Sequence, residues 1–230
     1  MLIDIQTRIE AACRRAGRDP GEVKLVAVTK GHDVEEIERE VLNKGHGVLG
    51  ENRVQEWRDK AAAFDEMGAD DKLGISIEWH MLGNLQRNKV KYCTPFALIH
   101  SLNSVRLADE LERQGEKRDH VFRALVEVNV ADEDSKRGAG LEEAERLVEY
   151  ARGLEHVEVK GLMAMAPYAD NPEASRPTFV KLHTLRDRLK LEELSMGMSG
   201  DFEVAIEEGA TIVRIGTAVF APEPKTARKG

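Results

Sequence analysis

Apolar positions along the chain follow two alternating periods. Short runs rich in valine, isoleucine and leucine recur, and each is followed by a longer segment with apolar residues three or four positions apart. The first pattern predicts buried strands and the second predicts amphipathic helices. The predicted strands span residues 24–30, 47–50, 75–79, 96–102, 121–130, 157–165, 193–198 and 211–219. The predicted helices between them span residues 33–44, 52–66, 84–92, 104–117, 141–153, 173–190 and 201–208.

One more helix precedes the first strand. Leu2, Ile5 and Ile9 fall at helical spacing, and Gly17 followed by Pro20 ends the pattern. Strict alternation of strands and helices requires a parallel sheet. Eight strands in 230 residues favour a closed ring over an open doubly wound sheet. The sequence therefore predicts an α/β fold, a single (β/α)8 TIM-type barrel with an extra N-terminal helix.

The pattern contains no composition change that would mark a domain boundary. We expect one barrel domain over residues 1–222, followed by a flexible C-terminal tail over residues 223–230. Hydrophobic residues make up 41% of the chain and charged residues 33%, which is typical of a folded globular protein rather than a disordered one.

Charge and cysteine content narrow the possible partners. The 34 basic and 42 acidic residues give a net charge of −8, which disfavours a nucleic-acid binder but leaves anionic small ligands open. No apolar run approaches the roughly 20 residues that span a bilayer, and the N-terminus lacks the apolar centre of a signal peptide. We therefore expect a cytoplasmic location and no membrane partner. Cys13 and Cys93 form no CxxC pair, so neither a disulfide framework nor a metal site is expected.

Candidate chemistry in a barrel lies where strands end and βα loops begin. Lys30 follows the apolar run of residues 25–28, so burial would favour its neutral amine, a nucleophile able to form a Schiff base. The alternative is a lysine whose stem lies on the strand end while its ammonium reaches water. Arg214 interrupts an apolar strand, and its guanidinium needs either a neighbouring carboxylate or a ligand atom as partner.

The last two strands of the predicted barrel end in small and hydroxyl-bearing residues. Ser199 precedes a short helix, and Gly216 and Thr217 follow Arg214. Loops in these positions often bind phosphate, because glycine lets the backbone approach the anion and hydroxyls donate to it. An ordinary helix cap beside a strand-end glycine would give the same pattern.

Three further residues are candidate walls of a ligand pocket. Asn52 and His80 follow the second and third strands, where a polar residue could equally cap a loop. Met165 ends the sixth strand, and it is interpreted as core or pocket wall rather than as a metal ligand, because no histidine or cysteine accompanies it.

An amine after the first strand, an arginine in the eighth and hydroxyls after the last two together describe a pocket for pyridoxal 5′-phosphate (PLP). The chain also resembles the YggS/PROSC family of pyridoxal phosphate homeostasis proteins, which have the barrel of the alanine racemase N-terminal domain. The motifs that carry this resemblance are AVTK at 27–30, GENRVQE at 50–56, EWHMLGNLQRNK at 78–89, DEDSKRG at 132–138, GLMAM at 161–165, SMGMS at 195–199 and VRIGTAVF at 213–220.

The resemblance implies roles for the candidate residues. Lys30 would hold PLP as a Schiff base, and Arg214 would face the pyridine nitrogen. The implied phosphate contacts are Ser199, Gly216 and Thr217, and the implied walls of the ring pocket are Asn52, His80 and Met165. The chain departs from the family pattern at Gly200, where an aspartate is usual, and this change is expected to loosen the start of the following helix.

A permanent arginine cation cannot take up the pyridine proton, so the ring would be a poor electron sink. Racemases with this arrangement use a second base from an additional C-terminal domain, and this chain ends soon after the eighth strand. We therefore expect a PLP carrier or buffer without robust turnover, as a monomer or weak homodimer, with PLP-dependent apoenzymes as candidate recipients. The alternatives are a fold-type III PLP enzyme such as an amino-acid racemase, and a barrel enzyme acting on a phosphorylated metabolite without PLP.

Overall fold

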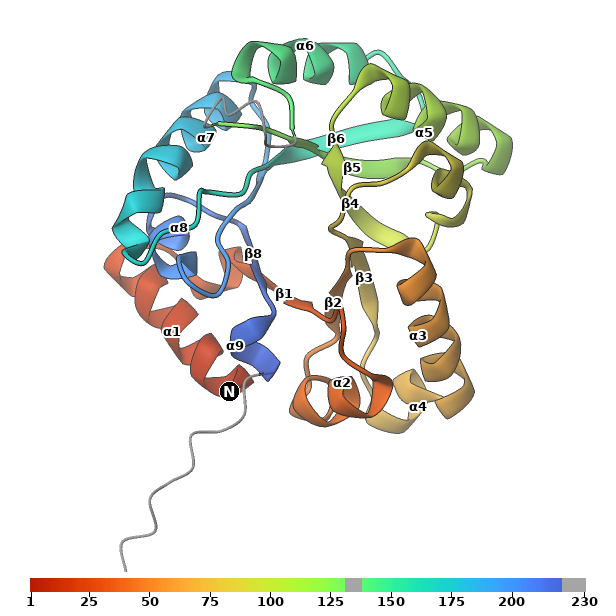
Figure 1. Cartoon of the computed structure of the whole chain (residues 1–230), viewed down its shortest axis with the longest axis vertical. Helices are drawn as coiled ribbons and strands as arrows, with labels where there is room; N and C mark the ends of the chain where they lie inside the picture. The colour runs from red at the N-terminus through yellow and green to blue at the C-terminus, as the bar shows by residue number, and fades with distance from the viewer. Residues whose placement is uncertain (131–137, 221–230) are drawn as a thin grey trace, which may run out of the picture.

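The protein folds as a closed barrel of eight parallel strands in sequential order. We analysed a computed structural model, which describes residues 1–130 and 138–220. Each strand pairs with the next, and β8 pairs with β1 to close the ring (Figure 1). The strands are β1 (Lys24–Val28), β2 (Val48–Glu51), β3 (Glu78–Met81), β4 (Phe96–Leu102), β5 (Phe122–Glu127), β6 (Val157–Met163), β7 (Glu193–Ser195) and β8 (Ile212–Ile215). The predicted fold class is therefore confirmed.

Helices cover the outside of the barrel. They are α1 (Leu2–Arg15), α2 (Val34–Glu40), α3 (Val54–Met67), α4 (Ala69–Leu73), α5 (Val105–Arg118), α6 (Leu141–Ala151), α7 (Arg176–Arg188), α8 (Phe202–Glu207) and α9 (Thr217–Phe220). Short 3-10 turns are η1 (Pro20–Glu22), η2 (Leu42–Lys44), η3 (Arg87–Tyr92) and η4 (Pro172–Ser175).

Local signals explain where several helices begin and end. Asp33 accepts a hydrogen bond from the Glu36 N–H at 2.8 Å and so caps the start of α2. Ser104 does the same for α5 through the Leu107 N–H. At the other end, Gly68 takes a left-handed φ of 60° and ends α3.

The structure departs from the sequence prediction in several places. The predicted strand 211–219 is too long, because β8 ends at Ile215 and the Gly216 carbonyl accepts the first hydrogen bonds of α9. The predicted helix over 84–92 is the 3-10 turn η3, and the short helix α4 was not predicted. Most of the DEDSKRG motif and the predicted tail 223–230 lie outside the described residues.

The core has two parts. The interior of the barrel holds a small cluster of Val26, Leu98, Leu125, Met163 and Ile212, and a much larger apolar layer fills the space between strands and helices. Most strand residues are therefore buried, as expected for a parallel barrel.

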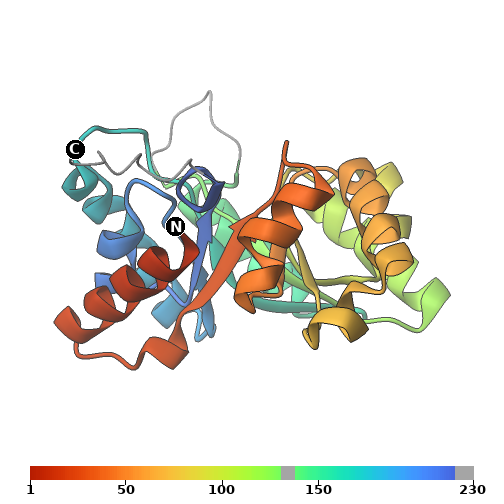
Figure 2. The same ribbon diagram turned by 90° about the horizontal axis from the view of Figure 1, so that it is seen from below.

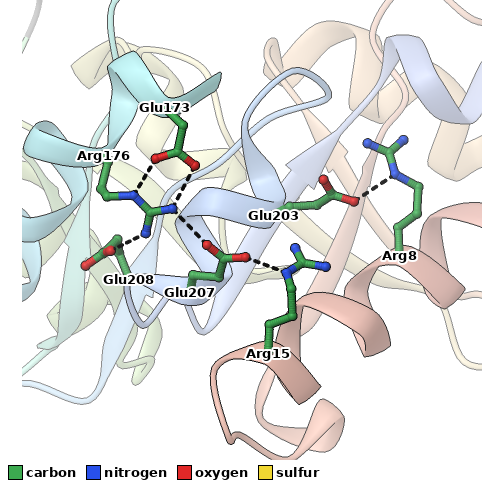
Figure 3. Close-up of polar contacts among 7 residues, drawn as sticks. All are labelled: Arg8, Arg15, Glu173, Arg176, Glu203, Glu207 and Glu208. Atoms are coloured by element: carbon green, nitrogen blue, oxygen red, sulfur yellow. Dashed lines mark hydrogen bonds and ion pairs between the residues drawn. The ribbon is translucent and has the colours of Figure 1, made fainter. Parts of the chain in front are cut away.

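The leading helix α1 lies across the outside of the barrel next to α8 and α9 (Figure 1; Figure 2). Its apolar face, including Leu2, Ile5 and Ile9, is buried. An ion-pair cluster reinforces the contact and extends it to α7 (Figure 3). Its pairs are Arg8–Glu203, Arg15–Glu207, and Arg176 with Glu173, Glu207 and Glu208. The extra helix thus braces the side of the barrel that carries α8 and the loop before it.

Candidate functional site

A cavity of about 800 Å³ opens at the carboxyl end of the barrel. Its walls come from the loops after β1, β6, β7 and β8. The lining includes Lys30 and His32 after β1, Ala166–Ala169 after β6, Met198–Asp201 after β7, and Arg214, Gly216 and Thr217 from β8 and the turn after it. Active sites of such barrels lie at this end, and pockets for small ligands span about 300–1,000 Å³.

Five of the predicted site residues meet in this cavity: Lys30, Ser199, Arg214, Gly216 and Thr217. They come from opposite ends of the chain and become neighbours because β1 pairs with β8. The side chains bring an amine, a guanidinium and two hydroxyls to one wall, which suits a ligand with an anionic group and a carbonyl.

The surroundings of Lys30 differ from the sequence expectation. β1 ends at Val28, two residues earlier than predicted, and Lys30 lies in the following turn, where it is exposed. The burial that was expected to favour a neutral amine is therefore absent. Gly31 follows with a left-handed φ of 77°, which glycine adopts without steric cost.

Arg214 lines the cavity and is buried, with 7% of the residue exposed. Its guanidinium donates to Ser195 Oγ at 2.5 Å and to the Ala164 carbonyl oxygen at 3.1 Å. Burial lowers the pKa of Arg214 to about 10, so the side chain is still a cation at neutral pH. A cation with two of its donors already committed is held in one orientation.

Ser195 is the first member of a hydrogen-bonded chain that crosses the interior of the barrel. Its Oγ lies 2.9 Å from His100 Nδ1, and His100 Nε2 lies 2.8 Å from His80 Nδ1. His80 Nε2 then lies 2.8 Å from Glu78 Oε1, and Glu78 also pairs with Lys24 at 2.7 Å. This series of hydrogen bonds starts near the cavity, at Arg214 on β8 and Ser195 on β7. It ends where β1 and β3 begin, at the opposite end of the barrel.

The residues at the two ends of this series determine which atom donates and which accepts in every hydrogen bond between them. Arg214 can only donate and the Glu78 carboxylate can only accept. Glu78 must therefore receive the His80 Nε2–H, and a neutral His80 accepts from His100 Nε2–H through its Nδ1. His100 Nδ1 then accepts from Ser195, whose oxygen accepts from Arg214. Both histidines are thereby assigned as neutral Nε2–H tautomers.

The protonation equilibria agree with this assignment. Burial lowers the pKa of His80, and burial together with the neighbouring His80 and Arg214 lowers the pKa of His100 well below its ordinary value. The hydrogen bond from His80, with help from Lys24, lowers the pKa of Glu78 to about 2. At neutral pH the chain therefore has a cation at one end, an anion at the other and neutral imidazoles between them.

The loop after β7 presents Ser199 to the cavity. Asp201 holds this loop, because Oδ1 accepts from the Met198 N–H at 2.7 Å and Oδ2 accepts from Ser175 Oγ at 2.9 Å. Ser199 Oγ lies 3.3 Å from the Ala218 N–H, which joins the loop to the turn after β8. Gly200 has no atom within 4 Å of an added Cβ, so the contacts of Asp201, rather than a side chain at 200, fix the loop.

Three predicted pocket residues do not line the cavity. His80 belongs to the buried chain described above. Asn52 follows β2, where its backbone packs against Gly83 so closely that a Cβ there would lie 2.1 Å from the Asn52 carbonyl oxygen. Met165, 52% exposed, follows β6 just before the lining residues 166–169. Their predicted role as walls of a ring pocket therefore finds no support in the lining of this cavity.

Sequence analysis missed three residues that do line it: His32, Tyr168 and Phe220. The His32 ring stacks on Phe220 with 3.8 Å between centroids, so the turn after β1 and α9 share one wall. The signal for His32 was its place two residues after Lys30. Phe220 was hidden because residues up to 219 were assigned to a strand.

Other kinds of site find no support among the described residues. Residues 1–130 and 138–220 contain no group of three or more histidine, cysteine or acidic side chains placed to hold a metal. Within the same residues, no helix combines the length and the apolar character needed to cross a bilayer. Cys13 and Cys93 are buried free thiols, and burial raises the pKa of Cys93 to about 12.

The fold and cavity define a class: a (β/α)8 barrel whose cavity at the carboxyl end is lined by a lysine, an arginine and two hydroxyl-bearing residues. Comparison with known proteins agrees. The alanine racemase N-terminal domain family matches residues 2–224. The pyridoxal phosphate homeostasis protein of Aquifex aeolicus is 48% identical over 226 residues, covering 95% of both chains. The chain belongs to the alanine racemase N-terminal domain family, and within it to the pyridoxal phosphate homeostasis proteins.

Solved structures show the same relationship. The crystal structure of an unknown protein from Bifidobacterium adolescentis has a TM-score of 0.86 at 35% identity, covering 94% of this chain and 91% of that one. PipY of Synechococcus elongatus, solved with PLP bound, has a TM-score of 0.78 at 31% identity, covering 93% of this chain and 99% of PipY.

The buried histidines predict a loss of stability in acid. Because their pKa values are lowered by folding, the unfolded chain binds more protons below its ordinary histidine pKa of about 6.5, and stability falls as the pH drops from there. We expect the free energy of unfolding in urea to decline from pH 7.5 to 5.5, by up to about 1.4 kcal/mol per pH unit for each histidine kept neutral. His46 and His120 act in the same direction, whereas His156, whose pKa is raised by its hydrogen bond with Glu112, acts in the opposite one.

The variant His100→Asn isolates the contribution of the buried chain. It removes one of the neutral imidazoles, so its unfolding free energy should depend less steeply on pH than that of the unsubstituted protein. An equal slope in both proteins would contradict the assignment of His100 as neutral at pH 5.5–6.5.

Proposed function

We propose that this protein binds PLP in the cavity at the carboxyl end of the barrel, with Lys30 as the covalent attachment point, and that it serves as an intracellular carrier or buffer of the cofactor. The observation that carries the proposal is the meeting of Lys30, Arg214, Ser199 and Thr217 in one cavity. The relative PipY, solved with PLP bound, supports the choice of ligand.

The residues of the cavity fit this cofactor. PLP supplies an aldehyde that condenses reversibly with a primary amine, and Lys30 is the lysine among the described residues that line the cavity. The volume of about 800 Å³ accommodates a ring with one phosphate. A side chain at Gly216 would come within 3.3 Å of Val28, so a glycine here keeps the turn after β8 close to β1.

Arg214 would face the pyridine nitrogen and limit the chemistry at the site. A guanidinium is a donor only and stays protonated, so it can donate a hydrogen bond to the nitrogen but cannot leave a proton on it. Its orientation is set by Ser195 and Ala164. The site therefore binds the cofactor well while giving little assistance to carbanion chemistry, which suits storage and delivery.

At the other end of the ligand, Ser199 and Thr217 would donate to the phosphate. The Ala218 N–H donates to Ser199 Oγ. This hydrogen bond joins the two loops, so it fixes the two hydroxyls relative to each other. Hydrogen bonds to a charged group stabilise a complex more than neutral ones do.

Location and assembly complete the proposal. We place the buffer in the cytoplasm, in keeping with the two unpaired cysteines, which a reducing compartment preserves. We propose that it acts as a monomer or weak homodimer, and that its recipients are PLP-dependent apoenzymes, which would need access to the open carboxyl end of the barrel.

Replacing Lys30 with alanine should abolish covalent capture of PLP. We expect the unsubstituted protein to gain a visible absorbance band with PLP and to increase in mass by one phosphopyridoxyl group after borohydride reduction. Lys30→Ala should show neither change. Lys44→Ala, at an exposed lysine of η2, is the matched control and should behave as the unsubstituted protein does. Mass gain at another residue in all three proteins would refute Lys30 as the attachment point.

The phosphate contacts can be tested by comparing PLP with pyridoxal, which lacks the phosphate. The double variant Ser199→Ala with Thr217→Val should lower the affinity for PLP by about tenfold or more, because it removes two donors to an anion. Its affinity for pyridoxal should change little. Equal losses for both ligands, measured by calorimetry, would place the phosphate elsewhere.

A buffer should also release its cargo. We expect the loaded protein to restore the activity of an apo-aminotransferase, with no more than one active site filled per loaded molecule. Loaded Lys44→Ala should do the same, whereas Lys30→Ala treated identically and freed of excess PLP should not.

A racemase would behave differently in the absence of acceptor. Tyr168 and His32 line the cavity, and such a reaction would need a residue of this kind as its second base. If chiral chromatography shows that each protein molecule forms many molecules of D-alanine from L-alanine, this result would favour a racemase over a PLP buffer.

A further inference from the structure

A cluster of buried and half-buried charges contacts the turn that carries Lys30, outside the lining of the cavity. It consists of Glu51 at the end of β2 together with Glu56 and Lys60 on α3. The Lys60 ammonium lies 2.6 Å from Glu51 Oε1 and 3.0 Å from Glu56 Oε1. The Glu51 side chain is fully buried and that of Lys60 is 8% exposed. The motif GENRVQE therefore supplies two carboxylates whose task is not contact with the ligand.

The cluster forms hydrogen bonds with the backbone on both sides of Lys30. Lys60 Nζ donates to the Thr29 carbonyl oxygen at 2.7 Å, and Glu56 Oε1 accepts from the Gly31 N–H at 2.6 Å. The Thr29 carbonyl belongs to the peptide plane before Lys30, and the Gly31 N–H belongs to the plane after it. Because each peptide is planar, holding both planes fixes the two backbone torsions of Lys30 and the direction of its Cα–Cβ bond.

Two further hydrogen bonds help to hold the backbone before Lys30. Thr29 Oγ1 donates to Glu51 Oε1 at 2.6 Å, and the Thr29 N–H donates to the Gly50 carbonyl oxygen at 3.0 Å. Although partial burial opposes its ionisation, the Gly31 N–H and Lys60 hold the pKa of Glu56 below its usual value. Glu56 is therefore a carboxylate at neutral pH, and its hydrogen bond to the backbone is charge-assisted.

Stability alone explains such a cluster poorly. Taking charges out of water costs free energy that their mutual attraction often fails to offset, and apolar side chains of similar size commonly stabilise a fold as well or better. Here the charges converge on the two peptide groups that flank one exposed lysine. Their arrangement is explained by what they do to that lysine.

We propose that Glu56 and Lys60 are positioning residues that fix the turn so that the Lys30 amine is presented to the aldehyde of the bound cofactor. This inference rests on the function proposed above and deepens it. In the capture step the neutral Lys30 amine would add to the aldehyde carbon, and the carbonyl oxygen would leave as water with the two amine hydrogens, so that a C=N bond replaces the C=O bond. Covalent capture should therefore depend on the cluster. Reversible binding of the ring and the phosphate involves residues of β7, β8 and the loops that follow them, and it should not depend on the cluster.

The experiment compares two ligands on the full chain. PLP reports covalent capture, followed by hydride trapping over time. Pyridoxine 5′-phosphate keeps the ring and phosphate but has an alcohol in place of the aldehyde, so calorimetry with it reports reversible binding alone. Glu56 is the better site for substitution, because removing Lys60 would leave the Glu51 charge buried without its partner and could unfold the protein.

We expect Glu56→Ala to capture PLP at least tenfold more slowly while its affinity for pyridoxine 5′-phosphate stays within twofold. Glu56→Gln keeps an oxygen that can accept from the Gly31 N–H and should recover most of the rate. Glu66→Ala, an exposed position on the same helix, is the matched control and should match the unsubstituted protein. Hydrogen exchange at the Gly31 amide without ligand should be faster in Glu56→Ala than in Glu66→Ala.

Three results would overturn the inference. These are capture by Glu56→Ala within twofold of Glu66→Ala, an equal fall in capture and in affinity for pyridoxine 5′-phosphate, and unchanged exchange at Gly31. Failure of the unsubstituted protein to capture PLP is a different result, because it refutes the proposed function itself, and the positioning role with it.

Discussion

The pairing of β8 with β1 is the interaction on which the site depends. It sets Lys24–Ala27 beside Ile212–Ile215 and closes the ring of strands. Lys30 follows one of these strands, Arg214 lies in the other, and Thr217 begins the helix after it. Residues nearly two hundred positions apart in the sequence therefore share one cavity wall. An open sheet with the same helices and strands would leave the amine and the guanidinium at opposite edges.

Closure also explains how a buried cation is tolerated. Because the barrel interior is enclosed, Arg214 can reach Ser195, and through His100 and His80 its hydrogen bonding continues to Glu78 at the far end. Every side-chain nitrogen and oxygen of Ser195, His100 and His80 has a hydrogen-bond partner, which offsets the penalty of burying it. The neutral imidazoles are needed for this, since an imidazolium would offer two donors where one must accept. Hydrogen bonds to Ser195 and Ala164 thus hold Arg214 in place inside the barrel.

Much of this could be read from the sequence, and the remainder could not for identifiable reasons. Periodicity gave the eight strands and the barrel, and strand-end position selected Lys30, Ser199, Arg214, Gly216 and Thr217. The pattern does not show which side chains meet across the interior, since that depends on register and strand tilt. His80 is therefore a predicted pocket wall from its position after a strand, and the structure places its ring in the buried hydrogen-bond network. Likewise, the exposure of Lys30 follows from β1 ending two residues early, a boundary that apolar patterning does not resolve.

The site has two supports that are built from different parts of the fold. On one side, α1 packs against α8, and Asp201 fixes the loop that carries Ser199. On the other side, the charges on β2 and α3 hold the turn that carries Lys30. No described hydrogen bond joins these two supports directly, so each can be weakened alone. A ligand that is held by one support and attached by the other can be released in two stages, first by loss of the covalent link and then by loss of the anion contacts. A reversible carrier needs that separation.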